Sequence, residues 1–424
     1  MKWIVRPSRL SGTIAVPPSK SHTIRALLIS TLADGTSKIR RPLLRGDGAS
    51  AIRAAKALGA DVEFRDEELV VTGIGSDFSR GIENIDMGNS GTGLNLFSSA
   101  AALGNRGRHF DGDQSLRSRP VRPLLKPLSE LGAEVVHENP RQDLPFTIKG
   151  PLRGGSVSVD GINSQFVSSL LFTCPLIPED TRITVFNLHE QPYIELTLWW
   201  LKKQNIRISH TEDFSSFHIT GGQKYQPFDI TVPSDFSSAT FAAVAGALSS
   251  SGLELTGLDF SDPQGDKGVF DVLSTMGADI EHVNGQSKVC GSALSGAVVD
   301  LNRMPDALPA LSVAAAAAGG ETEFVNVAQA RIKETDRITV MAQELTKMGI
   351  ATEELPDGLK VRGGKLRGAH VHGHHDHRVV MALAVAGMVA QGETVIDTAE
   401  AAEVTYPSFV EDFRALGADI EVVK

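Results

Sequence analysis

One pattern constrains this chain more than any other: a helical stretch that ends in a tight turn and leads into a short strand occurs six times. Examples are AIRAAKALGADVEF, VFDVLSTMGADIEHV and VEDFRALGADIEVV. The turn residues favour a left-handed helix cap, and they are Gly59, Gly132, Asn205, Gly277, Gly349 and Gly417. Such stretches are common in α/β proteins, but their regular spacing of 68 to 73 residues predicts six repeated units that each hold several strands and helices.

The segment GGQKYQPFDITVPSD, residues 221–235, is rich in glycine and proline and follows the third copy of the repeat. It divides the chain into three repeats and three. We therefore predict an α/β protein of two similar domains with a ligand-binding cleft between them.

Composition narrows the class of protein. The chain has 424 residues and a net charge of −10, so a non-specific nucleic-acid binder is not expected, and any anion site requires local clustering of Lys and Arg. Cys174 and Cys290 are too few for a disulfide framework, which favours the cytoplasm. The N-terminus has no signal-like apolar run, and stretches such as residues 311–319 are too short to span a bilayer.

Two glycine- or hydroxyl-containing segments precede helical runs. In PPSKSHTIRALL, Lys20, Ser21 and Arg25 lie at the start of such a run, where exposed amides favour an anion. In GNSGTG, residues 88–93, glycines allow backbone amides to approach a phosphate or carboxylate. Each segment alone is equally compatible with an ordinary helix cap or a tight turn.

Two further segments are rich in cations. GDQSLRSRP carries Arg117 and Arg119 before a proline. ARIKETDRI holds five charged residues, namely Arg331, Lys333, Glu334, Asp336 and Arg337. On a helix, Lys333 would share a face with Arg337 and with Asp336, and for this segment alone a solvated, salt-bridged helix face is the simpler interpretation.

A histidine cluster follows in HGHHDHR, which comprises His372, His374, His375, Asp376, His377 and Arg378 together with Gly373. The spacing is not that of a zinc protease. Structural or substrate-facing roles are therefore expected for these side chains rather than a metal site.

In this order, the segments resemble the enolpyruvyl transferases, in particular those that act on shikimate 3-phosphate. The resemblance runs from SKSHTIRA through GNSGTG, RPVRPLL, NSQFVSSLL, QPYIELTL, PDALPAL and RIKETDRI to DHRVVMA and VTYPSF, over essentially the whole chain. It implies two domains of three βαβαββ repeats each, an inside-out α/β barrel, with the active site in the inter-domain cleft. The implied domains are residues 1–18 with 233–424, on the phosphoenolpyruvate side, and residues 19–232, on the shikimate-phosphate side.

The resemblance also implies the reaction. The 5-hydroxyl of shikimate 3-phosphate attacks C2 of phosphoenolpyruvate while C3 is protonated, and the tetrahedral intermediate then loses phosphate. This chemistry requires cations for a phosphate and a carboxylate, and groups that move protons. The implied enzyme needs no metal or cofactor, and we expect a monomer whose partners are these two small substrates.

Residue roles carry over from the family position by position. The matching catalytic positions are Lys20, Asp306 and Glu334. The positions matching the shikimate 3-phosphate site are Lys20, Ser21, Arg25, Asn163, Ser164, Gln165, Tyr193, Asp306, Gln329 and Lys333. Those matching the phosphoenolpyruvate site are Lys20, Asn89, Gly91, Thr92, Arg119, Gln165, Arg337 and Arg378. Because Gly91 leaves room at the latter site, sensitivity to glyphosate is also expected.

The chain departs from the family pattern at several positions. Glu190 and Asn163 stand where serines of the acceptor-phosphate site are expected, and a carboxylate beside a phosphate is repulsive unless it turns away or bonds a cation. Gln329, Asn95 and Val404 replace the Asn, Arg and Lys that many members carry at those positions.

Four alternatives remain open from sequence. The first is a transferase that uses UDP-N-acetylglucosamine, although Gln114 stands where that family usually has a catalytic cysteine. The second is a transferase that uses another cyclic alcohol. A non-catalytic anion-binding protein and a metal-dependent hydrolase built on the histidine cluster are more distant possibilities.

Overall fold

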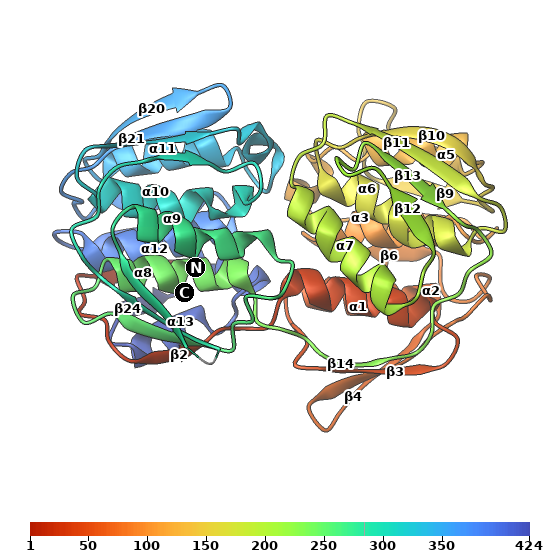
Figure 1. Ribbon diagram of the computed structural model, residues 1–424, viewed down its shortest axis with the longest axis horizontal. Helices are drawn as coiled ribbons and strands as arrows, with labels where there is room; N and C mark the ends of the chain where they lie inside the picture. The colour runs from red at the N-terminus through yellow and green to blue at the C-terminus, as the bar shows by residue number, and fades with distance from the viewer. Residues whose placement is uncertain (284) are drawn as a thin grey trace. The chain divides into compact units, whose positions relative to one another are not determined.

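The computed structural model describes residues 1–283 and 285–424, which divide into two compact units. Unit 1 comprises Met1–Ser19 and Pro233–Lys424, and unit 2 comprises Lys20–Val232. Each unit has its own hydrophobic core, and Figure 1 shows the helices and strands that make up each unit. The chain therefore leaves unit 1 after its N-terminal segment, completes unit 2 and then returns.

Within the described ranges, the named strands form six four-stranded sheets of one pattern. In each sheet the first two strands are parallel, and the other two are added antiparallel. In unit 2 the orders are β14 (Asp229–Thr231), β3 (Thr36–Arg40), β5 (Glu68–Thr72), β4 (Asp61–Arg65); β6 (Asn84–Asp86), β7 (Arg108–Asp111), β9 (Phe146–Lys149), β8 (Glu134–His137); and β10 (Gly155–Asp160), β11 (Thr181–Phe186), β13 (Ser216–Ile219), β12 (Ile208–His210).

Unit 1 repeats this arrangement. Its sheets run β2 (Thr13–Ala15), β15 (Leu253–Thr256), β17 (Gln286–Cys290), β16 (Asp279–Val283); β18 (Val298–Asp300), β19 (Glu321–Val325), β21 (Gly358–Arg362), β20 (Ala351–Leu355); and β22 (His370–His372), β23 (Thr394–Asp397), β1 (Lys2–Arg6), β24 (Asp419–Val423). Alternating burial along β3 and β11 shows that one face of these sheets covers the core while the other faces water.

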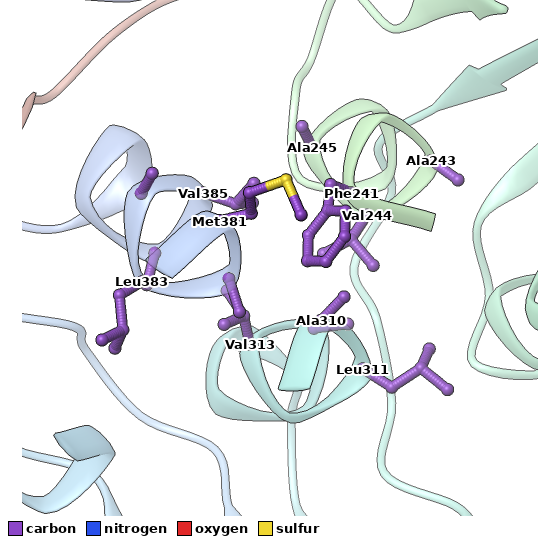
Figure 2. Close-up of a cluster of buried hydrophobic side chains, with 14 of the residues drawn as sticks. Phe241, Ala243, Val244, Ala245, Ala310, Leu311, Val313, Met381, Leu383 and Val385 are labelled. Atoms are coloured by element: carbon purple, nitrogen blue, oxygen red, sulfur yellow. The ribbon is translucent and has the colours of Figure 1, made fainter. Parts of the chain in front are cut away.

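Each repeat contributes one helix that is buried on almost all sides. These interior helices are α1 (Lys20–Leu32), α3 (Gly91–Ala101), α6 (Ser164–Thr173), α8 (Phe236–Ala247), α10 (Leu308–Ala317) and α12 (His377–Val389). Most of their residues are apolar or small, as in the LPALSVAAAA of α10, and a helix without a polar face is stable only inside a core. Figure 2 shows Phe241 of α8, Val313 of α10 and Met381 of α12 directed toward the space that these three helices share.

The second helix of each repeat is amphipathic and lies nearer the surface. These outer helices are α2 (Asp47–Leu58), α5 (Arg122–Glu130), α7 (Gln191–Lys203), α9 (Gly268–Thr275), α11 (Arg337–Lys347) and α13 (Phe409–Ala415). Each is followed by one of the six predicted turn residues, and every one of these has a positive φ, from 55° at Asn205 to 109° at Gly277. The predicted repeat, with its left-handed cap, is confirmed.

The remaining short elements are α4 (Gln114–Arg117) and the 3-10 turns η1 (Cys174–Leu176), η2 (Gly265–Lys267), η3 (Pro305–Ala307), η4 (Ala328–Ile332) and η5 (Ala399–Val404). No helix in residues 1–283 and 285–424 is long and apolar enough to cross a bilayer.

The segment predicted as a break, residues 221–235, itself contains a strand. Its β14 pairs in parallel with β3 of unit 2, whereas β2 from the N-terminal segment pairs in parallel with β15 of unit 1. The two units have therefore exchanged first strands. The chain changes unit each time between a first strand and the interior helix that follows it in sequence.

Candidate functional site

The fold explains why the predicted residues gather at one end of each unit. The first two strands of a sheet are parallel, so their carboxyl ends lie at the same edge. An interior helix follows one of these ends and an outer helix follows the other. Both helices therefore begin at that edge, where free backbone N–H groups and the helix dipole favour anions. The two units are described separately below.

In unit 1, Arg337 at the start of α11 binds three carboxylates. Its Nε donates to Asp376 Oδ2 at 2.8 Å, its Nη1 donates to Asp306 Oδ1 at 2.7 Å and its Nη2 donates to Glu334 Oε2 at 2.6 Å. The Arg337 side chain is 1% exposed. Burial alone would lower the pKa of this guanidinium, but the charges of Asp376, Glu334 and Asp306 raise it above its ordinary value.

Arg378 extends this network. It lies in the first turn of α12, is buried, and its Nη2 donates to Asp306 Oδ2 at 2.8 Å. Asp306, in η3 just before α10, therefore joins the two guanidinium groups through its two oxygens. One cluster therefore contains four predicted residues, Asp306, Glu334, Arg337 and Arg378. We call these four residues and Asp376 the unit 1 ion-pair network.

Asp376 was singled out from sequence only as part of the histidine segment. It is the N-cap of α12, where Oδ1 accepts from Arg378 N at 2.8 Å and Val379 N at 3.4 Å, and its side chain is fully buried. Its carboxylate therefore serves both the helix end and Arg337. An Asp immediately before a helical run was the available signal.

Asp266 is a further buried carboxyl near the network that the sequence did not reveal. It lies in η2, and Ser237 of α8 donates a hydrogen bond to it. Burial, together with the charge of Asp306, raises its pKa to about 6, and Arg378 opposes this rise. A carboxyl that titrates near neutral pH thus lies within electrostatic reach of both Asp306 and Arg378.

The prediction that ARIKETDRI forms one helix face is wrong. Residues 328–332 form η4, and α11 begins only at Arg337, with Asp336 as its N-cap accepting from Thr339 N at 3.1 Å. Because the chain turns between these helices, Glu334 folds back onto Arg337. Arg331 pairs instead with Asp336 at 2.7 Å.

Two other predicted residues of unit 1 lie in the same loop. Gln329 in η4 is 1% exposed, and its Nε2 donates to Asn302 O at 3.1 Å. Lys333, which directly follows η4, is partly buried. Both lie in the segment between β19 and α11, which also contains Glu334.

In unit 2, the N-termini of α3 and α6 are joined by Gln165. Its Nε2 donates to Thr92 Oγ1 at 3.0 Å, and its Oε1 accepts from Asn95 Nδ2 at 2.8 Å. Asn163 caps α6 through Gln165 N at 3.0 Å. Thus Asn95, which the sequence marked only as a departure from the family, holds a predicted substrate-site residue in place.

Glu190 is buried at the start of α7 in a left-handed conformation, with φ of 55°. Its Oε2 accepts from Ser164 Oγ at 2.7 Å. Ser164 was predicted to contact the acceptor, and in the structure its hydroxyl donates to this carboxylate.

Arg25 is 1% exposed in α1 and donates to neutral groups: Thr197 Oγ1 at 3.3 Å, Ser21 O at 3.1 Å and Tyr193 O at 3.5 Å. Burial lowers its pKa to about 10, and the contribution of Tyr193 opposes this shift. Arg25 therefore brings Ser21 and Tyr193, two other predicted residues, to one place.

Lys20 is the first residue of α1, and its Nζ lies 3.5 Å from Oδ2 of the buried Asp47 at the start of α2. Its side chain is 13% exposed, so the ammonium lies at the surface of the helix end with an ionic partner behind it. Asp47 was not identified from sequence.

Asn89 and Arg119 meet before α3. Asn89 Oδ1 accepts from Arg119 Nη2 at 2.7 Å, and Asn89 Nδ2 donates to Asp113 at 2.8 Å. A methyl group on Gly91 would lie 3.0 Å from Arg119 Nη1. By contrast, the more exposed Arg117 forms an ion pair with Asp111 and does not join this group.

The histidine cluster has partners within unit 1. His374 Nε2 donates to Glu344 Oε1 at 2.8 Å, and His372 Nε2 lies 3.6 Å from Asp397. Among residues 1–283 and 285–424, no group of three His, Cys, Asp or Glu side chains is arranged to hold a metal ion. Both cysteines are free thiols, and burial raises the pKa of Cys174 to about 12.

Known proteins share this sequence and fold. A family model described as EPSP synthase (3-phosphoshikimate 1-carboxyvinyltransferase) matches residues 4–413. The 3-phosphoshikimate 1-carboxyvinyltransferase of Ruminiclostridium cellulolyticum is 49% identical over 419 residues, 99% of each chain. The enzyme of that name from Acetivibrio thermocellus is 48% identical over 417 residues, 98% of each. A solved structure of EPSP synthase from Acinetobacter baumannii matches with a TM-score of 0.83 at 27% identity and covers both chains completely.

Proposed function

Because the chain belongs to the EPSP synthase family, we propose that the residues gathered at its helix N-termini carry out the reaction of that family. The chain is an enzyme that transfers the enolpyruvyl group of phosphoenolpyruvate to the 5-hydroxyl of shikimate 3-phosphate and releases phosphate. The observation that carries the assignment of residues is the unit 1 ion-pair network, in which two buried guanidinium groups are held by acidic side chains.

We assign the anion of phosphoenolpyruvate to Arg337 and Arg378 of unit 1 and to Arg119 of unit 2. Arginine binds carboxylate and phosphate as a planar fork, and buried carboxylates hold the forks of unit 1 in a fixed orientation before substrate arrives. In unit 2, Asn89 orients Arg119, and Gln165 orients the Thr92 hydroxyl. Within each unit, these side chains therefore need little reorientation to bind an anion.

We assign proton transfer to Asp306 and Glu334. Asp306 would accept the proton of the attacking 5-hydroxyl, and Glu334 would deliver a proton to C3 of phosphoenolpyruvate. An arriving anion repels the Glu334 carboxylate, which favours uptake of the proton that this step needs. Lys20 would stabilise the negative charge on the phosphoryl group that leaves.

The acceptor is assigned to the hydroxyl, amide and guanidinium groups of unit 2. Ser21, Arg25 and Tyr193 come together at one place, and Ser164 and Gln165 begin the neighbouring helix α6. We also assign Gln329 and Lys333 of unit 1 to the acceptor. Asn163 supports α6 rather than offering a free amide oxygen, because it caps the helix.

A phosphate-release assay tests this function. Phosphoenolpyruvate with shikimate 3-phosphate should release phosphate, whereas unphosphorylated shikimate should react far more slowly. Equal rates with both acceptors would overturn the assignment of the phosphorylated acceptor.

The same preparation should be a monomer by light scattering, since every residue assigned above comes from one chain.

We also propose that glyphosate, a small anion, competes with phosphoenolpyruvate for these arginines. Gly91→Ala should then weaken inhibition more than catalysis, because the added methyl group would lie 3.0 Å from Arg119 Nη1 and crowd an inhibitor at this place. Measuring the inhibition constant and the KM for phosphoenolpyruvate in both proteins tests this. An unchanged inhibition constant in Gly91→Ala would contradict the competition at this place.

A further inference from the structure

Helix α11 contacts the segment that leads into α12 at two separate points. Near its start, Arg337 binds Asp376 at 2.8 and 3.2 Å. Two turns further along, Glu344 accepts from His372 N at 3.0 Å and from His374 Nε2 at 2.8 Å. The first contact belongs to the proposed active site, but the second has no role in it so far.

Glu344 is unusual because it is a charged side chain in a core position. Its side chain is 1% exposed, and Lys347 Nζ lies 2.7 Å from Oε2. Burial alone would raise the pKa of Glu344, but hydrogen bonds from His374, Lys347 and His372 N lower it below its ordinary value. The carboxylate therefore stays ionised and keeps accepting hydrogen bonds at neutral pH.

The segment that Glu344 holds is bent in a way that needs support. His374 and His375 are both left-handed, with φ of 53° and 54°, which costs energy in residues other than glycine. His374 N donates to His372 Nδ1 at 2.8 Å, and Asp376 N donates to Gly373 O at 3.0 Å. These bonds and the Glu344 contact fix the direction in which the chain enters α12, and therefore the positions of Asp376 and Arg378.

We propose that Glu344 and His374 are positioning residues for Arg378. In the wild-type protein their contact holds residues 372–376 in the bent conformation that places Asp376 against Arg337 and Arg378 against Asp306. Without it, the segment relaxes and Arg378 loses its alignment toward the substrate anion. This inference rests on the proposed function, in which Arg378 binds phosphoenolpyruvate.

Two neighbouring histidines provide a matched test. His374→Asn and His375→Asn are the same substitution at the same backbone conformation, which Asn tolerates well. Only His374 bonds Glu344, whereas His375 is exposed. We expect His374→Asn to raise the KM for phosphoenolpyruvate about tenfold, the usual cost of a hydrogen bond to a charged group. The KM for shikimate 3-phosphate should stay near wild type, and His375→Asn should match wild type in both.

Conservative variants separate positioning from general stability. His374→Gln can still donate to Glu344 and should recover most of the affinity, and Glu344→Gln still accepts from His372 N and should be affected less than Glu344→Ala. If Glu344→Ala does not fold, the histidine series alone decides. Equal KM values in His374→Asn and His375→Asn would overturn the proposal. So would a fall in melting temperature with parallel rises in both KM values.

A readout without turnover distinguishes this inference from the proposed function. The rise in melting temperature caused by phosphoenolpyruvate alone reports anion binding, and it should be smaller in His374→Asn than in His375→Asn. If the wild-type protein released no phosphate, the function would fail while this comparison still decided the positioning role. An equal rise in both variants would overturn that role.

Discussion

Both units place polar groups at buried helix N-termini, but they stabilise these groups in different ways. In unit 1, Arg337 and Arg378 are surrounded by carboxylates, and the network is almost entirely charged. In unit 2, Arg25 donates to a hydroxyl and two carbonyl groups, and Gln165 joins Thr92 and Asn95. The pKa of the guanidinium rises in unit 1 and falls in unit 2, although both side chains are buried.

This contrast matches the two tasks in the proposed reaction. Charges that develop and protons that move require ionised groups held in fixed positions, as in unit 1. Recognition of a ring with several hydroxyl groups requires many neutral donors and acceptors, as in unit 2. Unit 2 also holds charged side chains besides Arg25, namely Lys20, which has Asp47 as its partner, Arg119, which Asn89 orients, and Glu190.

The largest effect is expected from removing groups that act on reacting atoms. Glu334→Ala and Lys20→Met should each lower kcat by about a hundredfold or more, because each removes a charge or proton donor that the transition state uses. Steady-state kinetics of the purified variants measures this, with circular dichroism as the control for folding. A folded variant with a near-normal kcat would remove that residue from the mechanism and break the division of tasks between the units.

Stability should separate the two buried arginines. Arg337→Met removes the cation that binds three carboxylates, of which Asp306 still keeps Arg378, and should lower the free energy of unfolding by about 3–5 kcal/mol. Arg25→Met loses hydrogen bonds to neutral groups but also removes a charge that burial disfavours, so its cost should be about 1 kcal/mol. Urea unfolding of both variants tests this difference. Equal losses would show that the carboxylates are not what distinguishes unit 1.

Asp266 tests the unit 1 network through pH. Its pKa of about 6 in the folded protein exceeds the ordinary value of 3.8, so the folded protein keeps this proton to a higher pH than the unfolded chain does. The favourable contribution is complete below about pH 4 and is lost as pH rises through 6. Asp266→Asn should therefore be more stable than wild type at pH 7.5 by on the order of 2 kcal/mol.

That gain should shrink as pH falls toward 4, because the wild-type carboxyl is then neutral as well. Melting temperatures of both proteins between pH 4 and 8 give the comparison. A difference that does not vary with pH would mean that Asp266 does not titrate in this range.

The repeat, its caps and the motif positions could be predicted from the sequence because each depends on local chemistry. A left-handed turn requires Gly or Asn, and Gly59 and Asn205 both provide it. The network could not be predicted, because it joins residues far apart in the chain: Asp306 contacts Arg378, and Arg337 contacts Asp376. Asp266 gave no local signal, since its environment is set by tertiary burial. Residues 333–336 were predicted as helix from the spacing of their charges. Asp336 instead caps the N-terminus of α11, so the helix begins only at Arg337.

The smallest effect, and the sharpest test of unit 2, concerns Glu190. Glu190→Gln keeps the size of the side chain and its bond with Ser164 while removing the charge. If the acceptor phosphate lies near Ser164, the loss of repulsion should lower the KM for shikimate 3-phosphate about fivefold, which corresponds to roughly 1 kcal/mol of binding free energy. The KM for phosphoenolpyruvate should not change, since Ser164, which donates to Glu190, is assigned to the acceptor and not to phosphoenolpyruvate. A higher KM for shikimate 3-phosphate would instead mean that the Glu190 carboxylate binds the acceptor directly. The acceptor would then be recognised by a charged group as well as by the neutral groups of unit 2.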